Sequence, residues 1–262
     1  LSKTVGAEFN RVQFTPDLMP SDVMGHAIYE GTSGGFRVRK GPVFTNFLLA
    51  DEINRAPAKT QSALLEVMQE RQISIEGTTY ELEPPFMTLA TQNPIEQDGT
   101  YPLPEAQLDR FLFKIRISYP EKAHEYDIVE SVTEDRIGDS FRIDQVDQVL
   151  NRKQARQLQR YAAQVTVDRR IVEYAVEIAR ATREWAGVST GAGPRGAISM
   201  VRAARPVALM ARRDHVIPDD VKQVAIPALR HRIMLTPEVE IERIEPEEIL
   251  RDVLKEVDVP RE

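Results

Sequence analysis

Two adjacent carboxylates, Asp51 and Glu52, directly follow the apolar run Phe47–Ala50. Such a run is typical of a buried strand, and a doubly wound sheet binds its ligand just beyond the carboxyl ends of its strands. Two acids at that place suit phosphoryl transfer, in which one holds Mg²⁺ on the phosphates and the other can polarise the attacking water. A solvated acidic turn after a strand is the alternative, and this stretch alone does not separate the two.

A further polar residue, Asn93, follows the next candidate strand along the chain, Phe86–Thr91. An asparagine there could hydrogen-bond a terminal phosphate or orient a water molecule between itself and Glu52. The alternative is a plain turn, because asparagine before proline, here Pro94, commonly opens one.

Two arginines occupy places from which they could reach phosphates. Arg110 precedes another apolar run, Phe111–Ile117, and an arginine donated to a neighbouring subunit can neutralise the charge on a transferring phosphoryl group. The alternative is a surface ion pair with Asp109 or Glu105, which would contribute little. Arg195 opens a helix in the stretch GPRG and could touch phosphates across a domain cleft, although glycine and proline there also fit simple helix capping.

The first half of the chain alternates between strands and helices. A helix is predicted over Pro57–Glu70, where proline suits the first turn and apolar residues form one stripe. The candidate strands are Arg11–Phe14, Val43–Ala50, Phe86–Thr91 and Phe111–Ile117. This alternation predicts a mainly parallel sheet covered by helices.

Two insertions interrupt the alternation. The first, Thr15–Pro42, is rich in glycine, proline and serine. It is too long for an ordinary connection, so it is predicted to be functional or disordered. The second, Gln72–Leu82, alternates apolar and polar residues around a glycine-containing turn, which predicts a β-hairpin.

The second half reads as helices, with apolar residues recurring at helical spacing. Pro206 falls inside the helix that begins near Arg195, and we expect it to kink or split that helix. His231 stands between two arginines and is expected at the surface. The change of pattern divides the chain into an α/β core, residues 1–125, and a helical lid, residues 126–262.

Composition narrows the possible functions. The chain has 262 residues and no cysteine, which excludes disulfides and thiolate metal sites and favours a reducing, cytoplasmic compartment. A net charge of −7 argues against nucleic acid as a partner, because phosphate binding needs a basic face. No apolar run approaches the ~18 residues of a membrane span.

The stretches LLADEINRAP, ATQNP, PEAQLDRF and GPRG follow one another in this order. Together they resemble the MoxR family of AAA+ ATPases over almost the whole chain. The resemblance implies a P-loop NTPase-type α/β core with a mainly parallel sheet, followed by a small all-α lid. It also implies ATP and Mg²⁺ as cofactors, a hexameric homo-oligomer, and chaperone-like remodelling or maturation of a partner protein complex. A DNA-dependent motor and a non-catalytic adaptor are the alternatives.

The resemblance assigns a role to each candidate residue. Asp51 is the Walker-B ligand of Mg²⁺, acting through water, and Glu52 is the catalytic base or water positioner. Asn93 is sensor 1, and Arg110 is the arginine finger for a neighbouring subunit. Arg195 is the sensor-2 arginine, acting on its own nucleotide or on a neighbour's.

One family motif, G-x-x-x-x-G-K-[ST], is absent from these residues. The resemblance places it upstream of Leu1, and Lys3-Thr4 does not replace it, since the preceding glycines are missing. Because its backbone N–H groups and lysine cradle the β- and γ-phosphates, we expect the full-length protein to be an ATPase. This segment alone is expected not to bind ATP tightly.

Overall fold

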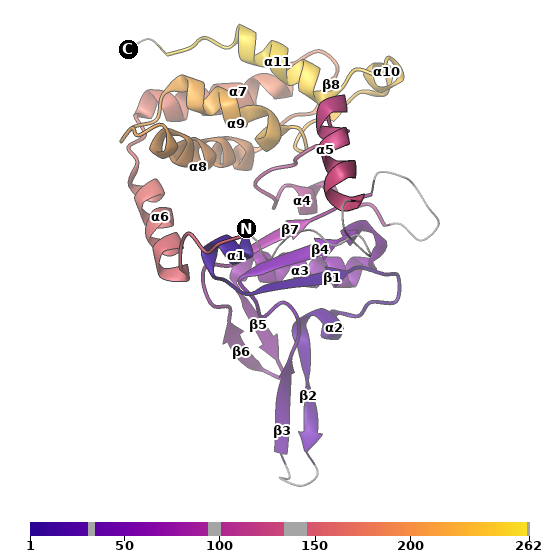
Figure 1. The fold of residues 1–262 in the computed structure, drawn as a ribbon. Coiled ribbons are helices and arrows are strands. Elements are labelled where there is room, and N and C mark those ends of the chain that lie inside the picture. The colour runs from indigo at the N-terminus through magenta and orange to yellow at the C-terminus, as the bar shows by residue number, and fades with distance from the viewer. Residues whose placement is uncertain (31–34, 94–100, 134–145, 261–262) are drawn as a thin grey trace.

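The computed structural model describes residues 1–30, 35–93, 101–133 and 146–260. Figure 1 shows two bodies, an α/β core around a small sheet and a layer of helices beyond it. The fold is therefore the predicted one, a mainly parallel sheet with helices followed by an all-α lid.

The central sheet has three parallel strands in the order β1-β4-β7. Their bounds are Phe9–Gln13 for β1, Phe47–Asp51 for β4 and Met87–Ala90 for β7. The register pairs Gln13 with Asp51 and Ala50 with Ala90. The carboxyl ends of all three strands therefore meet at one edge of the sheet.

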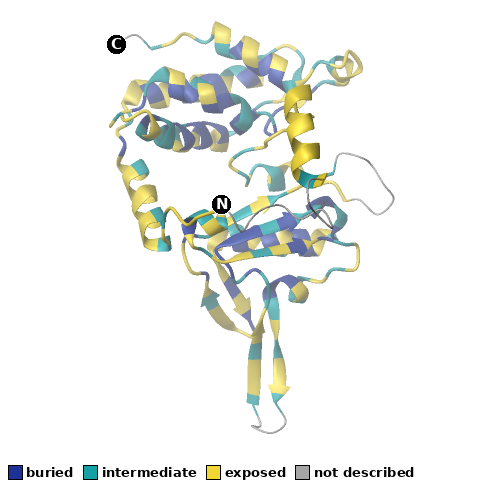
Figure 2. Cartoon of the chain, viewed as in Figure 1, coloured by how far each residue is buried: buried dark blue, intermediate teal, exposed yellow. Residues whose placement is uncertain are grey.

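Helix α3, Ala58–Glu70, covers the sheet between β4 and β7. Pro57 is its N-cap, and Arg71 ends it with a left-handed φ of 53°. Leu64 and Leu65 are fully buried, and Ala63 and Met68 of its apolar stripe are partly buried. Figure 2 shows buried residues along β4 and this helix in the core, and along the helices of the lid. Short helices α1 (Ser2–Val5), η1 (Ile53–Arg55) and α4 (Glu105–Leu108) complete the core.

The first insertion forms ordered structure over its described residues. Helix α2, Pro20–Met24, leads into a hairpin of β2, Gly25–Glu30, and β3, Gly35–Lys40. The hairpin projects away from the sheet (Figure 1), and the residues joining its strands lie outside the described part. The second insertion is the predicted hairpin, with β5 over Gln72–Ile75 and β6 over Thr78–Glu81.

One predicted strand, Phe111–Ile117, does not form. The segment runs without regular secondary structure along the lid, where the backbone N–H of Lys114 donates to the carbonyl of Pro227 at 2.9 Å. Strand propensity reflects packing against a neighbouring strand, and here the main-chain partners come from the lid. Helix α5, Lys122–Thr133, follows and spans the predicted boundary between residues 125 and 126, which stays a prediction.

The lid is built from helices whose apolar faces meet in one core. Ile178, Met200, Leu229 and Leu250 are fully buried there. Its elements are α6 (Arg152–Gln164), α7 (Arg169–Glu184), β8 (Val188–Thr190), α8 (Pro194–Met210), α9 (Pro218–Leu229), β9 (Met234–Leu235), α10 (Pro237–Ile241) and α11 (Pro246–Glu256). Among the described residues, no helix is both long and apolar enough to cross a membrane.

One expectation for the lid is narrowed and another needs correction. Helix α8 continues through Pro206 to Met210 without splitting, and a kink at Pro206 stays a prediction. His231 is buried, not at the surface. Burial, reinforced by the neighbouring Arg232, lowers the pKa of His231 to about 4, so its ring is neutral at physiological pH.

Candidate functional site

Asp51 ends β4 with both carboxylate oxygens engaged. Oδ1 accepts a hydrogen bond from the hydroxyl of Thr91, and Oδ2 accepts from Arg11 Nε at 3.0 Å. These two contacts, the Thr91 hydrogen bond first and then the Arg11 guanidinium, lower the pKa of Asp51 below its usual value. The side chain is therefore a charged oxygen ligand at neutral pH.

Glu52 occupies a backbone conformation that non-glycine residues seldom adopt, with a φ of 54°. Its own N–H donates to Thr91 Oγ1 at 2.8 Å. Its carboxylate Oε2 accepts from Gln13 Nε2 at 2.8 Å and from Arg55 Nη1 at 3.0 Å. In this conformation the Glu52 side chain contacts Gln13 at the end of β1 and Arg55 in the turn that follows.

Asn93 lies in the segment that leaves β7, beside the turn that follows β4. The amide of Asn54 donates to its backbone carbonyl at 3.2 Å, and the N–H of Ile53 donates to the carbonyl of Thr91 at 3.0 Å. These bonds bring Asp51, Glu52 and Asn93 to the ends of two neighbouring strands, as the sequence predicted.

The sequence pattern does not point to several residues at this edge. Arg11, Gln13 and Thr91 contact the two acids directly. Gln61, inside α3, is fully buried and donates to the carbonyls of Ile53, Ala56 and Tyr101 at 3.1, 3.1 and 2.9 Å. Gln61 thereby holds the turn that presents the acids.

The two predicted arginines lie elsewhere. Arg110 is exposed, and its Nη1 contacts the carbonyl of Leu65 on α3 at 3.4 Å. Arg195, in the first turn of α8, lies 3.5 Å from Asp109. Among the described residues, Arg11 forms an ion pair with Asp51 and Arg55 forms one with Glu52, and the roles of Arg110 and Arg195 stay predictions.

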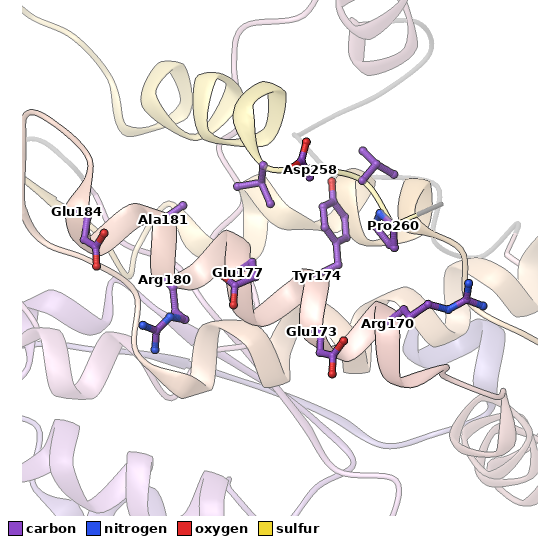
Figure 3. A pocket seen from close by; sticks show the side chains of 11 residues that line it. Arg170, Glu173, Tyr174, Glu177, Arg180, Ala181, Glu184, Asp258 and Pro260 are labelled. Atoms are coloured by element: carbon purple, nitrogen blue, oxygen red, sulfur yellow. The ribbon is translucent and has the colours of Figure 1, made fainter. Parts of the chain in front are cut away.

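A separate groove of about 600 Å³ runs along α7 beside residues 257–260 of the lid. Figure 3 shows arginine and glutamate side chains of α7 along it, among them Arg170, Glu173 and Arg180. Because all its lining residues belong to the lid, it is not part of the edge that carries Asp51 and Glu52.

The hydroxyl of Thr91 gives a pH-dependent prediction. Thr91→Val removes a hydrogen bond to the charged Asp51, so the pKa of Asp51 should rise. A carboxyl whose folded pKa is depressed stabilises the fold above its unfolded pKa, near 3.8, and that contribution is lost as pH falls through the folded pKa. We expect the variant to lose about 1–2 kcal/mol of unfolding free energy at pH 7 and less at pH 3, measured by urea unfolding.

Thr88→Val is the matched control, because the buried hydroxyl of Thr88 makes no hydrogen bond to any described residue. Its effect on the free energy of unfolding should be the same at both pH values. A difference between wild type and Thr91→Val that does not change with pH would show that the hydroxyl does not stabilise the ionised Asp51.

Comparison with known proteins identifies the fold family. Residues 1–113 match the model described as "ATPase family associated with various cellular activities (AAA)", and residues 180–253 match "AAA lid domain". A crystal structure of a putative ATPase from Cytophaga hutchinsonii superposes with a TM-score of 0.89 at 43% identity, covering 99% of this chain and 80% of that one.

Two relatives with similar sequences indicate the family within the AAA ATPases. The chain is 48% identical to the uncharacterised protein YeaC of Bacillus subtilis, over 99% of this chain and 80% of YeaC. It is 46% identical to Chaperone MoxR1 of Mycobacterium tuberculosis, over 99% of this chain and 70% of MoxR1. The chain belongs to the MoxR family of AAA+ ATPases.

Proposed function

We propose that the full-length protein hydrolyses ATP and uses the energy to remodel or mature a partner protein complex in the cytoplasm. The observation that carries the proposal is the placement of Asp51 and Glu52 at the carboxyl end of the middle strand, with Asn93 at the end of its neighbour. The relative named Chaperone MoxR1 supports the chaperone-like half of the proposal.

The residues at this edge fit a magnesium ion. Mg²⁺ prefers oxygen ligands and usually binds through one or two carboxylates together with waters and phosphates. The contacts of Asp51 keep its carboxylate ionised, so Asp51 would hold the ion. When bound, the ion neutralises charge on the phosphates. Within the described residues no cluster of three or more acidic, histidine or cysteine side chains offers a fuller set of ligands.

Glu52 is the residue that we propose to position the attacking water and accept its proton. Gln13 and Arg55 bond the same oxygen of Glu52, Oε2, so these contacts orient the carboxylate while its other oxygen can accept a further hydrogen bond. Asn93 would bind the terminal phosphate or the same water from the adjoining strand.

Arg110 would complete the site of a neighbouring subunit. Among the described residues, its exposed side chain makes one long contact, from Nη1 to the carbonyl of Leu65, which involves one of its five donors. An arginine donated across a subunit contact requires an oligomer, and head-to-tail contacts that close form a ring. Arg195 would contact nucleotide from the lid, in its own subunit or in the next.

The proposed function is tested with the complete gene product by measuring phosphate release from ATP over a range of Mg²⁺ concentrations. Asp51→Asn keeps the shape and removes the charge, so half-maximal turnover should need about tenfold to hundredfold more Mg²⁺. Turnover that appears only with single-stranded DNA would favour a nucleic-acid motor. Magnesium-independent or absent turnover in the wild type would contradict the proposal.

A further inference from the structure

The carboxylate of Asp109 links the segment that carries Arg110 to two arginines of the lid. Asp109 Oδ2 lies 3.5 Å from Arg195 Nη1, and Asp109 Oδ1 accepts from Arg232 Nε at 2.8 Å. Asp109 is also the residue directly before Arg110 and the C-cap of α4. Asp109 therefore stands next to Arg110 in the chain and forms an ion pair with Arg195.

Arg232, which follows α9, has all five of its N–H donors paired, four of them with residues 109–112. Its guanidinium donates to the carbonyls of Asp109, Phe111 and Leu112 at 2.9, 2.7 and 3.3 Å, in addition to the Asp109 carboxylate. The last donor bonds the carbonyl of Ala228 in α9. The side chain is only 2% exposed, and a buried guanidinium is tolerated when its donors are paired.

Arg110 itself is held differently from the backbone around it. Three carbonyls within residues 109–112 are fixed to the lid, and His231 Nε2 bonds one of them, that of Phe111, at 3.1 Å. The side chain of Arg110 remains exposed with a contact of 3.4 Å. The lid therefore anchors the backbone at the base of Arg110, while the exposed guanidinium makes, among the described residues, only the long contact to Leu65.

We propose that Arg232 is a positioning residue that couples the lid to the arginine finger, so that Arg110 and Arg195 move together. The inference rests on the proposed function, because it assumes that Arg110 serves the nucleotide of a neighbouring subunit. A change in the lid around one nucleotide would then be transmitted through Asp109 to the finger offered to the next subunit.

Arg232→Lys is the first test. Lysine keeps the charge but presents a compact ammonium with three donors on a flexible stem, which cannot reproduce the planar fork of five. Since a displacement of about 1 Å can cost about 10²-fold in rate, we expect kcat to fall about tenfold to hundredfold. KM for ATP should change less than about twofold, because the residue does not touch the nucleotide.

A mixing experiment separates an effect on the finger from an effect on the subunit's own site. Oligomers of the complete gene product are assembled from equal amounts of Arg232→Lys and Glu52→Gln subunits. Where a Glu52→Gln subunit lends its intact finger to an Arg232→Lys subunit, turnover should return. Random assortment makes roughly a quarter of head-to-tail contacts productive, so the mixture should far exceed the mean of the separate variants.

Two controls make the result specific. Arg110→Ala mixed with Glu52→Gln tests the finger itself: if that mixture stays inactive, the proposed trans arginine fails. If it recovers and the Arg232→Lys mixture does not, the coupling role of Arg232 is wrong. Arg213→Lys alters a comparable bidentate ion pair, to Asp220 at 2.7 and 2.6 Å inside the lid, and should leave kcat within about twofold.

A second variant keeps the inference testable if Arg232→Lys unfolds, as judged by thermal melting. Asp109→Asn keeps the shape of the side chain and the three carbonyl bonds to Arg232, and removes the charge shared by Arg195 and Arg232. The same mixing experiment should again restore turnover. Wild-type kcat in both Arg232→Lys and Asp109→Asn would overturn the coupling.

Discussion

Glu52→Gln should lower kcat for ATP hydrolysis about 10²- to 10⁴-fold while the affinity for ATP stays within a few-fold of wild type. The amide has nearly the same size as the carboxylate but cannot accept the proton of the attacking water. Its carbonyl oxygen can still accept from Gln13, as the carboxylate does at 2.8 Å, so the turn should persist. Phosphate release measures kcat, and a fluorescent nucleotide measures binding.

Glu66→Gln is the matched control, since it makes the same chemical change on the exposed face of α3 in the same domain. Its turnover should equal that of the wild type. Unchanged turnover in Glu52→Gln would support a non-catalytic adaptor. Joint loss of binding and turnover would instead assign Glu52 a structural role.

Arg110→Ala should lower kcat about 10³-fold, the low end of what an arginine finger contributes. The fold should tolerate the change, because the exposed side chain makes a 3.4 Å contact to the carbonyl of Leu65. Nucleotide affinity of the altered subunit should hold, since the finger acts on a neighbour. Turnover of oligomers mixed with Glu52→Gln subunits is the decisive measurement, and activity should reappear there.

Lys59→Ala removes an exposed basic side chain from α3 and serves as the control for loss of surface charge. It should change neither kcat nor the behaviour of the mixtures. If Arg110→Ala subunits remained inactive beside Glu52→Gln subunits, Arg110 would have to act within its own chain.

The positions of Asp51, Glu52 and Asn93 could be predicted because the signal is local. Each follows an apolar run, and an apolar run that stops at polar residues marks the end of a buried strand. A helix between two strands makes them parallel, which brings their carboxyl ends to one edge. The structure has this arrangement, with β4 and β7 as neighbours.

The partners of those acids could not be predicted, because they depend on strand register. Arg11 and Thr91 each lie 40 residues from Asp51 along the chain. Moving either strand by one residue would turn these side chains to the opposite face of the sheet. No local pattern encodes that choice, so the contacts that lower the pKa of Asp51 became visible only in three dimensions.

The contact around Arg232 was missed for a different reason. Phe111–Ile117 has the composition of a strand, and Arg230–Arg232 reads as an exposed, charged turn. Tertiary contacts override both patterns, because the carbonyls of one segment satisfy the donors of the other. Burial of a charged side chain depends on such pairing, which a pattern of polar and apolar residues does not reveal.

At Glu52, whose backbone is left-handed, the residue that is best for stability differs from the residue that is best for activity. Glycine would adopt this conformation without the cost of about 1–3 kcal/mol that a side chain brings. A variant selected only for resistance to heat would therefore gain from glycine there and lose its carboxylate. Substitutions at residue 52 that raise the melting temperature should therefore lower the turnover of ATP.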